Sequence, residues 1–397
     1  MTEALAGIRV LDFSRFVSGA FCAQLLGELG AEVTKIEIPG GGDGLRSTPP
    51  FTERQESYFF IGLNRGKKSI TLDLRTKRGQ EIARELVKKQ HVLVENFSRG
   101  VMERFGLGYQ ELKNVNPALI YASVSRFGAT GPYSSRPVYD TIAQAMGGLM
   151  AVTGFHDGPP IRTGPSIADY LSGLFAAIGV LAALRYMETT GEGQLVDISM
   201  QDCVWAITAM EFASTYFATG KIPSRLGNNL PISVPANVYS CKDGYVVIMA
   251  VTVGQWSNLL KAMGREDLVR LQKYYGQGDR TQNRDEVNAL VQGWADTKTV
   301  EEITNTLSRF HVPCSRILTI DQVANDPQIL SREMIVEVDQ LISGRVKMPG
   351  SVLKLSRTPG DVSPPAPFLG KHNYEIYSEV LGYSEQEINK LSDEGII

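Results

Sequence analysis

Hydrophobic and polar positions follow a repeating order through the first third of the chain. Runs of aliphatic and β-branched residues at Ile8–Phe13 and Glu32–Ile38 predict strands. Ser18–Gly30 and Lys77–Lys89 have the three-to-four-residue spacing of amphipathic helices. The same order continues with a strand, a helix and a strand at His91–Phe97, Val101–Lys113 and Leu119–Phe127. Strands that alternate with helices predict an α/β fold with a Rossmann-like, parallel sheet.

The turn after the first predicted strand differs from that of nucleotide-binding dehydrogenases. It reads Ser-Arg-Phe-Val-Ser-Gly over Ser14–Gly19, whereas a dinucleotide site carries G-x-G-x-x-G at this place. The sequence therefore still predicts a Rossmann-like fold, but it does not predict NAD or FAD as a cofactor.

The second half of the chain predicts a change of architecture near Gly220. Before it, a long apolar helix at Ser166–Glu188 leads into a strand at Gln194–Ser199. After it come a strand pair and two helices, at Asn237–Ser240, Tyr245–Ala250, Gln255–Met263 and Val300–Arg309. A Pro-rich stretch, Pro349–Pro367, precedes a terminal helix at Ser384–Leu391. We expect a smaller α+β domain after Gly220.

Composition narrows the class of protein. The 397 residues include 40 Lys and Arg against 43 Asp and Glu, a net charge of −3, which argues against binding nucleic acid by bulk electrostatics. The four cysteines are scattered, so neither a metal site nor a disulfide framework is predicted. The N-terminus lacks a signal-peptide pattern, and the apolar run Leu171–Ala183 is too short to cross a bilayer. We expect a cytoplasmic protein that does not bind membranes.

Asp169 stands at the start of the long apolar helix and has two interpretations. Ser166-x-x-Asp169 resembles a capping box, in which a carboxylate in the first turn favours the helix dipole. Alternatively, a carboxylate held where a loop meets a helix can serve as a covalent nucleophile. The spacing favours capping and does not exclude the nucleophile.

A basic loop, Asn64-Arg-Gly-Lys-Lys-Ser69, precedes a strand-like segment at Ser69–Leu72. It lacks the spacing of a Walker A motif. Two interpretations remain open: a phosphate-binding loop and a solvated basic turn.

Many segments, taken in order, resemble the class III CoA-transferases, the CaiB/BaiF family that includes formyl-CoA and carnitine CoA-transferases. The match extends over nearly the whole chain, which makes it more specific than any single motif. The segments that carry it are Gly7–Phe13, Gly27–Glu37, Gly41–Asp43, Asn64–Ile70, Leu72–Leu74, Glu95–Phe97, Gly128–Tyr133, Tyr139–Asp140, Gly147–Gly148, Asp169–Tyr170, Gly191–Gln194 and Leu369–His372.

The resemblance implies that Asp169 is the catalytic nucleophile of a CoA-transferase. It would form a mixed anhydride and then an aspartyl-CoA thioester as CoA passes from a donor acyl-CoA, such as succinyl-CoA, to an acceptor acid. Backbone N–H groups near the helix start would stabilise the oxyanions. The resemblance implies no metal and no tightly bound cofactor, with coenzyme A and acyl-CoA as substrates.

Site residues are carried over position by position. The positions that match the family's CoA contacts are Leu74, Arg75, Asn96, Phe97, Arg104 and Arg136. Those that match its substrate pocket are Arg15, Val17, Tyr139 and Asp140. Val17 replaces the Gln of oxalate-specific relatives, and Val251–Gln255 replaces their glycine loop, so an oxalate-specific enzyme is disfavoured. Arg15, Arg46 and Arg225 are candidates to pair with a second carboxylate of the acceptor.

Two other functions are alternatives. An α-methylacyl-CoA racemase of the same fold needs a His and Asp pair, and Ser135–Asp140 contains no His. A CoA-binding partner subunit is the other alternative, although the chain retains Asp169. The resemblance also implies an interlocked homodimer, with a related heteromer as the alternative. Its large domain would comprise residues 1–219 and 331–397, and its small domain residues 220–330.

Overall fold

The computed structural model describes residues 3–136 and 139–397. The chain divides into two compact units, which are described separately. Unit 1 comprises Met1–Leu149, Thr163–Ser214 and Pro327–Ile397, and unit 2 comprises Met150–Arg162 and Thr215–Asp326. The domain ranges 1–219, 220–330 and 331–397 stay a prediction. They place residues 150–162 with the first range, whereas contacts group these residues with unit 2.

Unit 1 contains a sheet of six parallel strands in the order β3-β2-β1-β4-β5-β6. The strands are β1 (Arg9–Asp12), β2 (Glu32–Glu37), β3 (Lys68–Thr71), β4 (Val92–Glu95), β5 (Ile120–Ser125) and β6 (Leu195–Ser199). This is the strand order of the doubly wound Rossmann fold, in which ligands bind beyond the carboxyl ends of the strands. The predicted α/β class with a parallel sheet is confirmed.

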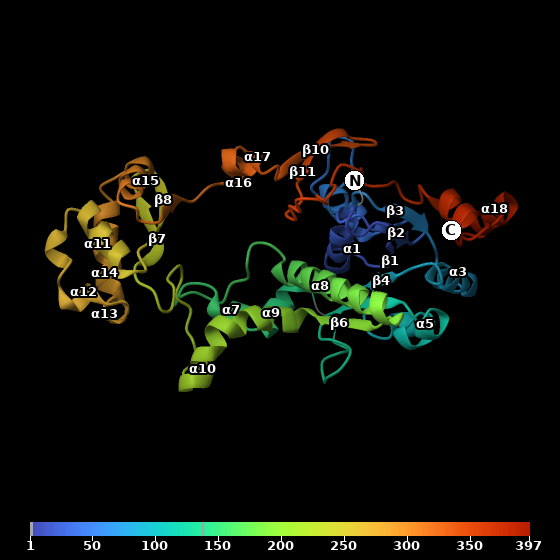
Figure 1. The fold of residues 1–397 in the computed structure, drawn as a ribbon, viewed down its shortest axis with the longest axis horizontal. Coiled ribbons are helices and arrows are strands. Elements are labelled where there is room, and N and C mark those ends of the chain that lie inside the picture. The colour runs from blue at the N-terminus through green and yellow to red at the C-terminus, as the bar shows by residue number, and fades with distance from the viewer. Residues whose placement is uncertain (1–2, 137–138) are drawn as a thin grey trace. The chain divides into compact units, whose positions relative to one another are not determined.

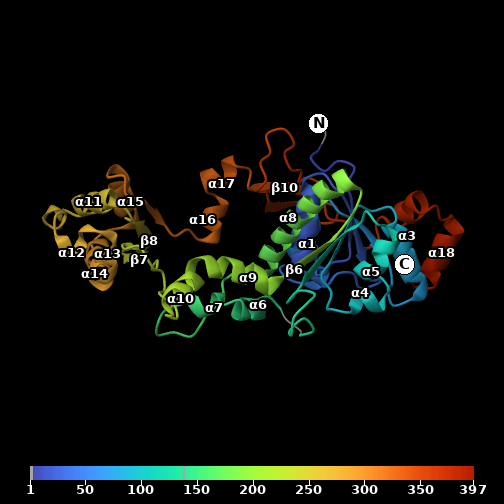
Figure 2. The ribbon, with the colours of Figure 1, turned by 60° about the horizontal axis from the view of Figure 1, so that its bottom comes forward.

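Side chains of successive strand residues point to opposite faces of a sheet. Figures 1 and 2 show that helices cover both faces of this sheet. Val10 packs with α1 (Ser18–Glu28) and α8 (Ile167–Thr190), while Leu11 packs with α3 (Lys77–Val87) on the other face. The second face is completed by C-terminal side chains, including those of α18 (Glu385–Asp393). The two ends of the chain therefore share one hydrophobic core.

The prediction of a single helix over Val101–Lys113 is wrong. Two short helices replace it, α4 (Val101–Arg104) and α5 (Tyr109–Val115). Gly106 lies between them with a φ of +62°, a left-handed conformation that glycine adopts without strain. The break lets Leu107 and Leu112 both reach the core of the second face.

Helix α8 is longer than the apolar run that the sequence suggested. Its 24 residues are long and apolar enough, by length and composition, to cross a membrane, so the length argument from Leu171–Ala183 does not hold. One side of α8 packs against the sheet through residues such as Ala176 and Val180. The core helix of a soluble protein passes the same test.

The other elements of unit 1 are short helices and one antiparallel hairpin. Helix α2 (Tyr58–Asn64) and the hairpin formed by β10 (Ile335–Gln340) and β11 (Gly344–Pro349) share a small hydrophobic cluster with Tyr170 and Val17. The remaining elements are η1 (Gly44–Ser47), α6 (Asp140–Met146), α7 (Leu149–Val152), α9 (Met200–Thr208), η2 (Ala209–Ala213), α10 (Ser214–Thr219), α17 (Pro327–Ser331) and η4 (Glu375–Val380). Of these, α7 and α10 run across the boundary between the two units.

Unit 2 is built on an antiparallel sheet in the order β7-β8-β9. Helices pack on it around Trp256, Leu259 and Val291, which are buried. Its elements are β7 (Ala236–Cys241), β8 (Gly244–Met249), α11 (Val253–Ala262), η3 (Glu266–Leu268), α12 (Gln272–Tyr275), α13 (Gln277–Gln282), α14 (Arg284–Ala295), α15 (Val300–Arg309), β9 (Cys314–Arg316) and α16 (Ile320–Ala324). The predicted strand pair and the two predicted helices are present, whereas β9, η3, α12, α13, α14 and α16 were not predicted.

Candidate active site

Asp169 lies in the first turn of α8, but the predicted capping box is wrong. The N-cap residue Ser166 makes no side-chain capping hydrogen bond. The carboxylate of Asp140, at the start of α6, accepts hydrogen bonds from the N–H groups of Ala168 at 2.8 Å and Asp169 at 3.4 Å. A second carboxylate therefore caps α8 from another helix and lies beside the backbone of Asp169.

Gln144 joins this arrangement one turn along α6. Its Nε2 donates to Oδ2 of Asp140 at 2.6 Å, and its Oε1 accepts from the N–H of Thr163 at 3.0 Å. Asp140 and Gln144 are both buried. The pair thus ties the loop before α8 to α6. Sequence reasoning missed Gln144, although its i, i+4 spacing from Asp140 on a helix is a signal for such a pair.

Burial, together with the smaller effect of the nearby charge of Asp140, raises the pKa of the Asp169 carboxyl to about 7. Burial favours the neutral form of a carboxyl group, and a like charge beside it adds to that preference. A carboxylate that is more basic than usual is a stronger nucleophile when it is ionised. This property fits the nucleophile interpretation of Asp169.

The amides of the first turn of α8 are already occupied. Besides Ala168 and Asp169, the N–H of Ile167 donates to the Pro165 carbonyl at 2.9 Å, and that of Tyr170 to the Ser166 carbonyl at 3.2 Å. The expectation that amides at this helix start serve as free oxyanion donors is therefore wrong for these four groups.

Close packing of α1 against α8 places Val17 in one hydrophobic cluster with Tyr170, the residue after Asp169. A Cβ at Gly173 would lie 2.5 Å from the carbonyl oxygen of Ser18, so the two backbones touch. The rings of Phe21 and Tyr170 meet edge to face at 5.1 Å, and Val17 packs in the same cluster as Tyr170. Two predicted pocket residues, Val17 and Asp140, therefore flank the first turn of α8 in unit 1.

Tyr139 directly precedes Asp140, and its side chain is 76% exposed. It caps no helix by a side-chain hydrogen bond.

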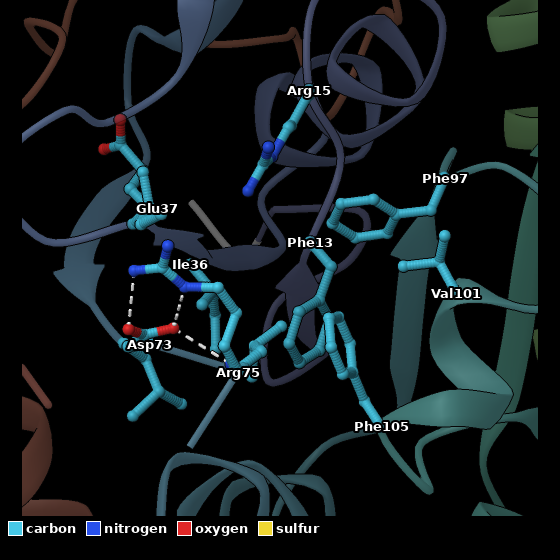
Figure 3. Close-up of a pocket in the computed structure, with 12 residues that line it drawn as sticks. Phe13, Arg15, Ile36, Glu37, Asp73, Arg75, Phe97, Val101 and Phe105 are labelled. Atoms are coloured by element: carbon cyan, nitrogen blue, oxygen red, sulfur yellow. Dashed lines mark hydrogen bonds and ion pairs between the residues drawn. The ribbon is translucent and has the colours of Figure 1, made fainter.

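A pocket of about 350 Å³ opens beyond the carboxyl ends of β1, β2, β3 and β4. Figure 3 shows Phe97 and Phe105 on one side and the Arg75–Asp73 pair on the other, with Arg15 reaching in between. The position agrees with the general place of ligand sites in such sheets. Its lining is mostly apolar and consists of Phe13, Arg15, Ile36, Glu37, Ile38, Leu72, Asp73, Leu74, Arg75, Phe97, Val101 and Phe105.

The pocket brings together four predicted site residues, of which Arg15 and Arg75 are cationic. Arg75 donates to both oxygens of Asp73, at 2.8 and 2.7 Å, which leaves its third guanidinium nitrogen open. The Arg15 guanidinium lies 5.2 Å from the centre of the Phe97 ring. Leu74 and Phe97 contribute apolar surface to the same lining.

The other predicted CoA contacts lie outside this lining. Asn96 uses its side-chain amide to hold the backbone of Arg15, accepting at 2.8 Å and donating at 2.7 Å. Arg104 is exposed at the end of α4. Arg136 is exposed and stacks over Tyr133 at 4.0 Å.

Two of the three arginines considered for an acceptor carboxylate are engaged elsewhere. Arg46 binds both oxygens of Glu37, each at 2.7 Å. Arg225 donates to backbone carbonyls of residues 155–158 in unit 2. In unit 2, Thr252 and Gln255 form the capping box that begins α11, so this segment is a helix start rather than a glycine loop.

The buried residues of the basic loop Asn64–Ser69 form neither a phosphate-binding loop nor a solvated turn. Arg65 pairs with Glu28 at 2.5 Å, and Lys67 pairs with Asp12 at 2.8 Å, in both cases away from solvent. Lys68 is partly exposed and pairs with Glu32 and Glu375. The described residues also contain no group of three or more His, Cys, Asp or Glu side chains placed to hold a metal ion.

Comparison with known proteins gives consistent results. The model of "CoA-transferase family III" matches residues 5–373. The chain is 38% identical to the succinyl-CoA–D-citramalate CoA-transferase of Chloroflexus aurantiacus, over 99% of this chain and 98% of that protein. It is 35% identical to the formyl-CoA:oxalate CoA-transferase of Rhodopseudomonas palustris, over 100% and 98%.

A solved structure of a CaiB/BaiF family protein from Brucella suis has the same fold. It superposes with a TM-score of 0.85 at 33% identity and covers 96% of this chain and 100% of that one. The match of the family model over most of the chain and the coverage of both relatives extend well beyond the Rossmann-like sheet. The chain belongs to CoA-transferase family III and is a CoA-transferase.

Proposed function

We propose that the protein transfers CoA from a donor acyl-CoA, with succinyl-CoA as the first candidate, to a carboxylic acid through covalent intermediates on Asp169. The observation that carries this proposal is the carboxyl of Asp169, which is held at the start of α8 with a pKa raised by burial to about 7. A relative named for succinyl-CoA and citramalate supports the choice of donor.

The chemistry proceeds by four acyl transfers. The Asp169 carboxylate attacks the donor thioester, which gives an acyl-aspartyl anhydride and CoA thiolate. The thiolate attacks the aspartyl carbonyl, so the donor acid leaves and an aspartyl-CoA thioester remains. The acceptor carboxylate attacks this thioester, which releases the thiolate and forms a second anhydride. The thiolate then attacks the acceptor's carbonyl, giving the product acyl-CoA and free Asp169.

The pocket at the carboxyl ends of β1–β4 matches the nucleotide end of CoA. Phe13, Phe97 and Phe105 offer aromatic surface for the adenine ring. Arg15 and Arg75 supply guanidinium groups, which bind phosphates through charge-assisted hydrogen bonds. We therefore assign Arg15 to the CoA phosphates rather than to the acceptor acid. Exposed Arg104 and Arg136 are further candidates for these phosphates.

Trapping of the anhydride tests the proposal. The wild-type protein is incubated with succinyl-CoA and hydroxylamine, and its peptides are analysed by mass spectrometry. We expect a hydroxamate on Asp169, because hydroxylamine attacks acyl-aspartyl groups. Asp202→Asn, a substitution on α9, is the control and should leave the label in place. Full transfer activity in Asp169→Asn would contradict the mechanism.

Further measurements with the same donor distinguish the alternative functions. Racemase activity would place solvent deuterium at the α-carbon of the acyl group without exchange of CoA between acids. A partner subunit without catalysis would bind CoA and acquire no label. A panel of mono- and dicarboxylic acids with succinyl-CoA then identifies the acceptor.

We also propose that the chain assembles as an interlocked homodimer. In support, α8 exposes a row of large apolar side chains on the side that does not face the sheet. These are Leu174, Phe175, Ile178 and Leu181. An apolar face of this kind is typical of a surface that a protein partner covers. A heteromer with a related chain is the alternative that a mass measurement on the purified chain distinguishes.

A further inference from the structure

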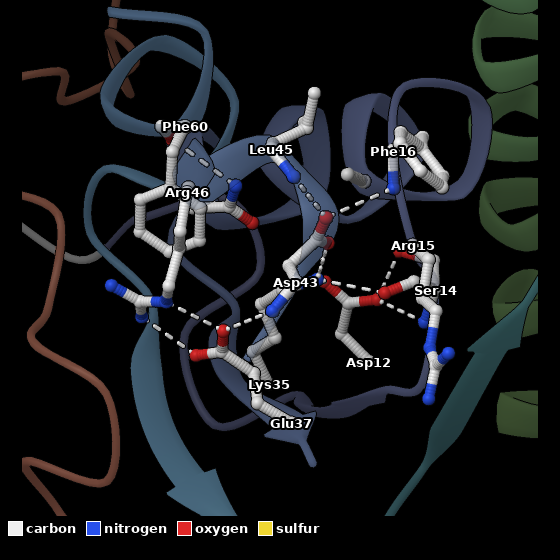
Figure 4. Close-up of polar contacts among 12 residues, drawn as sticks. Asp12, Ser14, Arg15, Phe16, Lys35, Glu37, Asp43, Leu45, Arg46 and Phe60 are labelled. Carbon is white, nitrogen blue, oxygen red and sulfur yellow. Dashed lines mark hydrogen bonds and ion pairs between the residues drawn. The ribbon is translucent and has the colours of Figure 1, made fainter. Parts of the chain in front are cut away.

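A buried cluster of charged side chains lies beneath the turn that follows β1 (Figure 4). Asp12 and Lys35 are fully buried, and Asp43 and Lys67 are 3% exposed. Lys35 Nζ lies 3.0 Å from Asp43 Oδ2 and 3.8 Å from Asp12 Oδ2, and Lys67 Nζ lies 2.8 Å from Asp12 Oδ2. Two positive and two negative charges thus balance within the cluster.

Three hydrogen bonds join the cluster to the backbone of Ser14 and Phe16, in the turn Ser14–Val17. Lys35 Nζ donates to the Ser14 carbonyl at 2.8 Å, and the Ser14 N–H donates to Asp12 Oδ1 at 2.8 Å. The Phe16 N–H donates to Asp43 Oδ1 at 3.3 Å. Together with Asn96, which binds both backbone groups of Arg15, these contacts anchor three successive residues.

A contribution to the stability of the folded state does not by itself account for such a cluster of buried charges. Removing charges from water is costly, and well-packed apolar side chains of similar volume are often as stabilising as a buried ion pair. What the cluster provides is a fixed backbone conformation in the turn. Phe16 has a φ of +59°, which is unfavourable for a residue with a side chain and persists only where surrounding contacts determine it. The charged cluster and Asn96 provide those contacts.

Arg15 lies between the anchored residues Ser14 and Phe16, and its side chain lines the pocket beside Phe97. A cation on a fixed backbone loses less conformational freedom on binding a phosphate than one on a mobile loop. We propose that Asp12, Lys35 and Asp43 are positioning residues, which hold the Ser14–Val17 turn so that Arg15 meets the phosphates of CoA. This inference rests on the CoA pocket proposed above.

A double-mutant cycle on CoA affinity tests the inference. The dissociation constant of CoA is measured by calorimetry for wild type, Arg15→Ala, Lys35→Met and the double variant. We expect each single substitution to raise the constant about tenfold, the size of one charge-assisted hydrogen bond. Because both act through the same guanidinium, the double variant should be no weaker than Arg15→Ala.

Arg65→Met is the matched control. It also removes one partner of a buried ion pair, with Glu28 at 2.5 Å, but Arg65 does not touch the turn. We expect it to lower the melting temperature as Lys35→Met does and to leave CoA affinity unchanged within about twofold. If Lys35→Met fails to fold, Asp43→Asn replaces it, because it keeps an oxygen acceptor for the Phe16 N–H and removes the ion pair. We expect a rise of about threefold, absent when Arg15 is already Ala.

The outcomes separate the two proposals. If wild type does not bind CoA, the proposed function is wrong. If wild type binds CoA and Arg15→Ala has no effect, the CoA proposal stands and the positioning role is overturned. The positioning role is also overturned if the losses from Lys35→Met and Arg15→Ala add, or if Lys35→Met matches Arg65→Met in affinity.

Discussion

At the scale of single residues, the protonation of Asp169 should govern the pH dependence of activity. Its pKa is raised to about 7, and only the ionised carboxylate attacks a thioester. We expect kcat/KM for the acyl-CoA donor to fall about tenfold for each pH unit below 7. Asp140→Asn removes the like charge and should move this limb to lower pH. An unchanged limb in that variant would show that Asp140 does not influence the nucleophile.

The stability of the protein should also depend on the ionisation of Asp169. It should fall as pH rises, whereas activity should rise. The folded pKa of about 7 lies above the ordinary value of 3.8, so between these values the native state binds more protons than the unfolded state. The contribution of Asp169 to stability is then lost as pH rises through 7. We expect Asp169→Asn to be more stable than wild type at about pH 8 and to approach it at about pH 4. Urea unfolding at the two pH values measures the difference. A gain of equal size at both would contradict the raised pKa.

At the scale of elements, the contact between α1 and α8 depends on Gly173. A Cβ there would lie 2.5 Å from the Ser18 carbonyl oxygen, and backbone cannot yield without a shift of the whole helix. We expect Gly173→Ala to destabilise the protein by about 1–3 kcal/mol and to lower kcat, since Val17 and Asp169 lie at this contact. Gly293→Ala in α14 is the control. Nothing lies within 4 Å of its Cβ, so a gain of about 0.4–1 kcal/mol is expected. Equal effects of the two substitutions on the free energy of unfolding would refute the close-packing argument.

At the scale of the whole molecule, the end of the chain supports the pocket at its beginning. Ile396 and Ile397 are each 7% exposed in the core on one face of the sheet. The carbonyl of Ile396 accepts from the N–H of Asp73, a pocket residue, at 2.7 Å.

We expect deletion of residues 394–397 to cost about 3–6 kcal/mol, from two buried isoleucine side chains. The KM for acyl-CoA should rise as well, because Asp73 loses its backbone partner. Lys390→Ala, at an exposed position of α18, is the control and should change neither value. A truncated protein with normal stability and KM would show that the C-terminus is dispensable.

The proposed dimer belongs to the same scale. Light scattering on the purified full-length chain should give twice the mass of one chain. Ile178→Glu places a charge at a position that is 53% exposed on the apolar face of α8. If the second copy covers that face, the substitution should abolish the dimer or prevent soluble expression, since an unpaired charge is costly to bury. A stable wild-type monomer would contradict the proposed assembly.

The pattern along the chain was enough to predict the α/β class, most strands of the sheet and the position of Asp169 at a helix start. These features depend on neighbours within a few residues, where periodicity and turn chemistry operate. The helix over Val101–Lys113 failed because a glycine break outweighed an otherwise continuous pattern. The interpretations of the basic loop were wrong because Arg65 and Lys67 are buried and paired with Glu28 and Asp12. These two carboxylates are far away in sequence.

The sequence by itself determined the order of strands and helices and, through resemblance, the candidate nucleophile. Only the tertiary structure showed that Asp140 rather than Ser166 caps α8, that Arg15 shares a pocket with Arg75 and Phe97, and that Ile396 supports Asp73. Each of these pairings joins residues that no local period relates. The pocket forms because the parallel sheet brings the ends of its strands to one edge. The other two pairings form because buried backbone groups need hydrogen-bond partners, which distant segments supply.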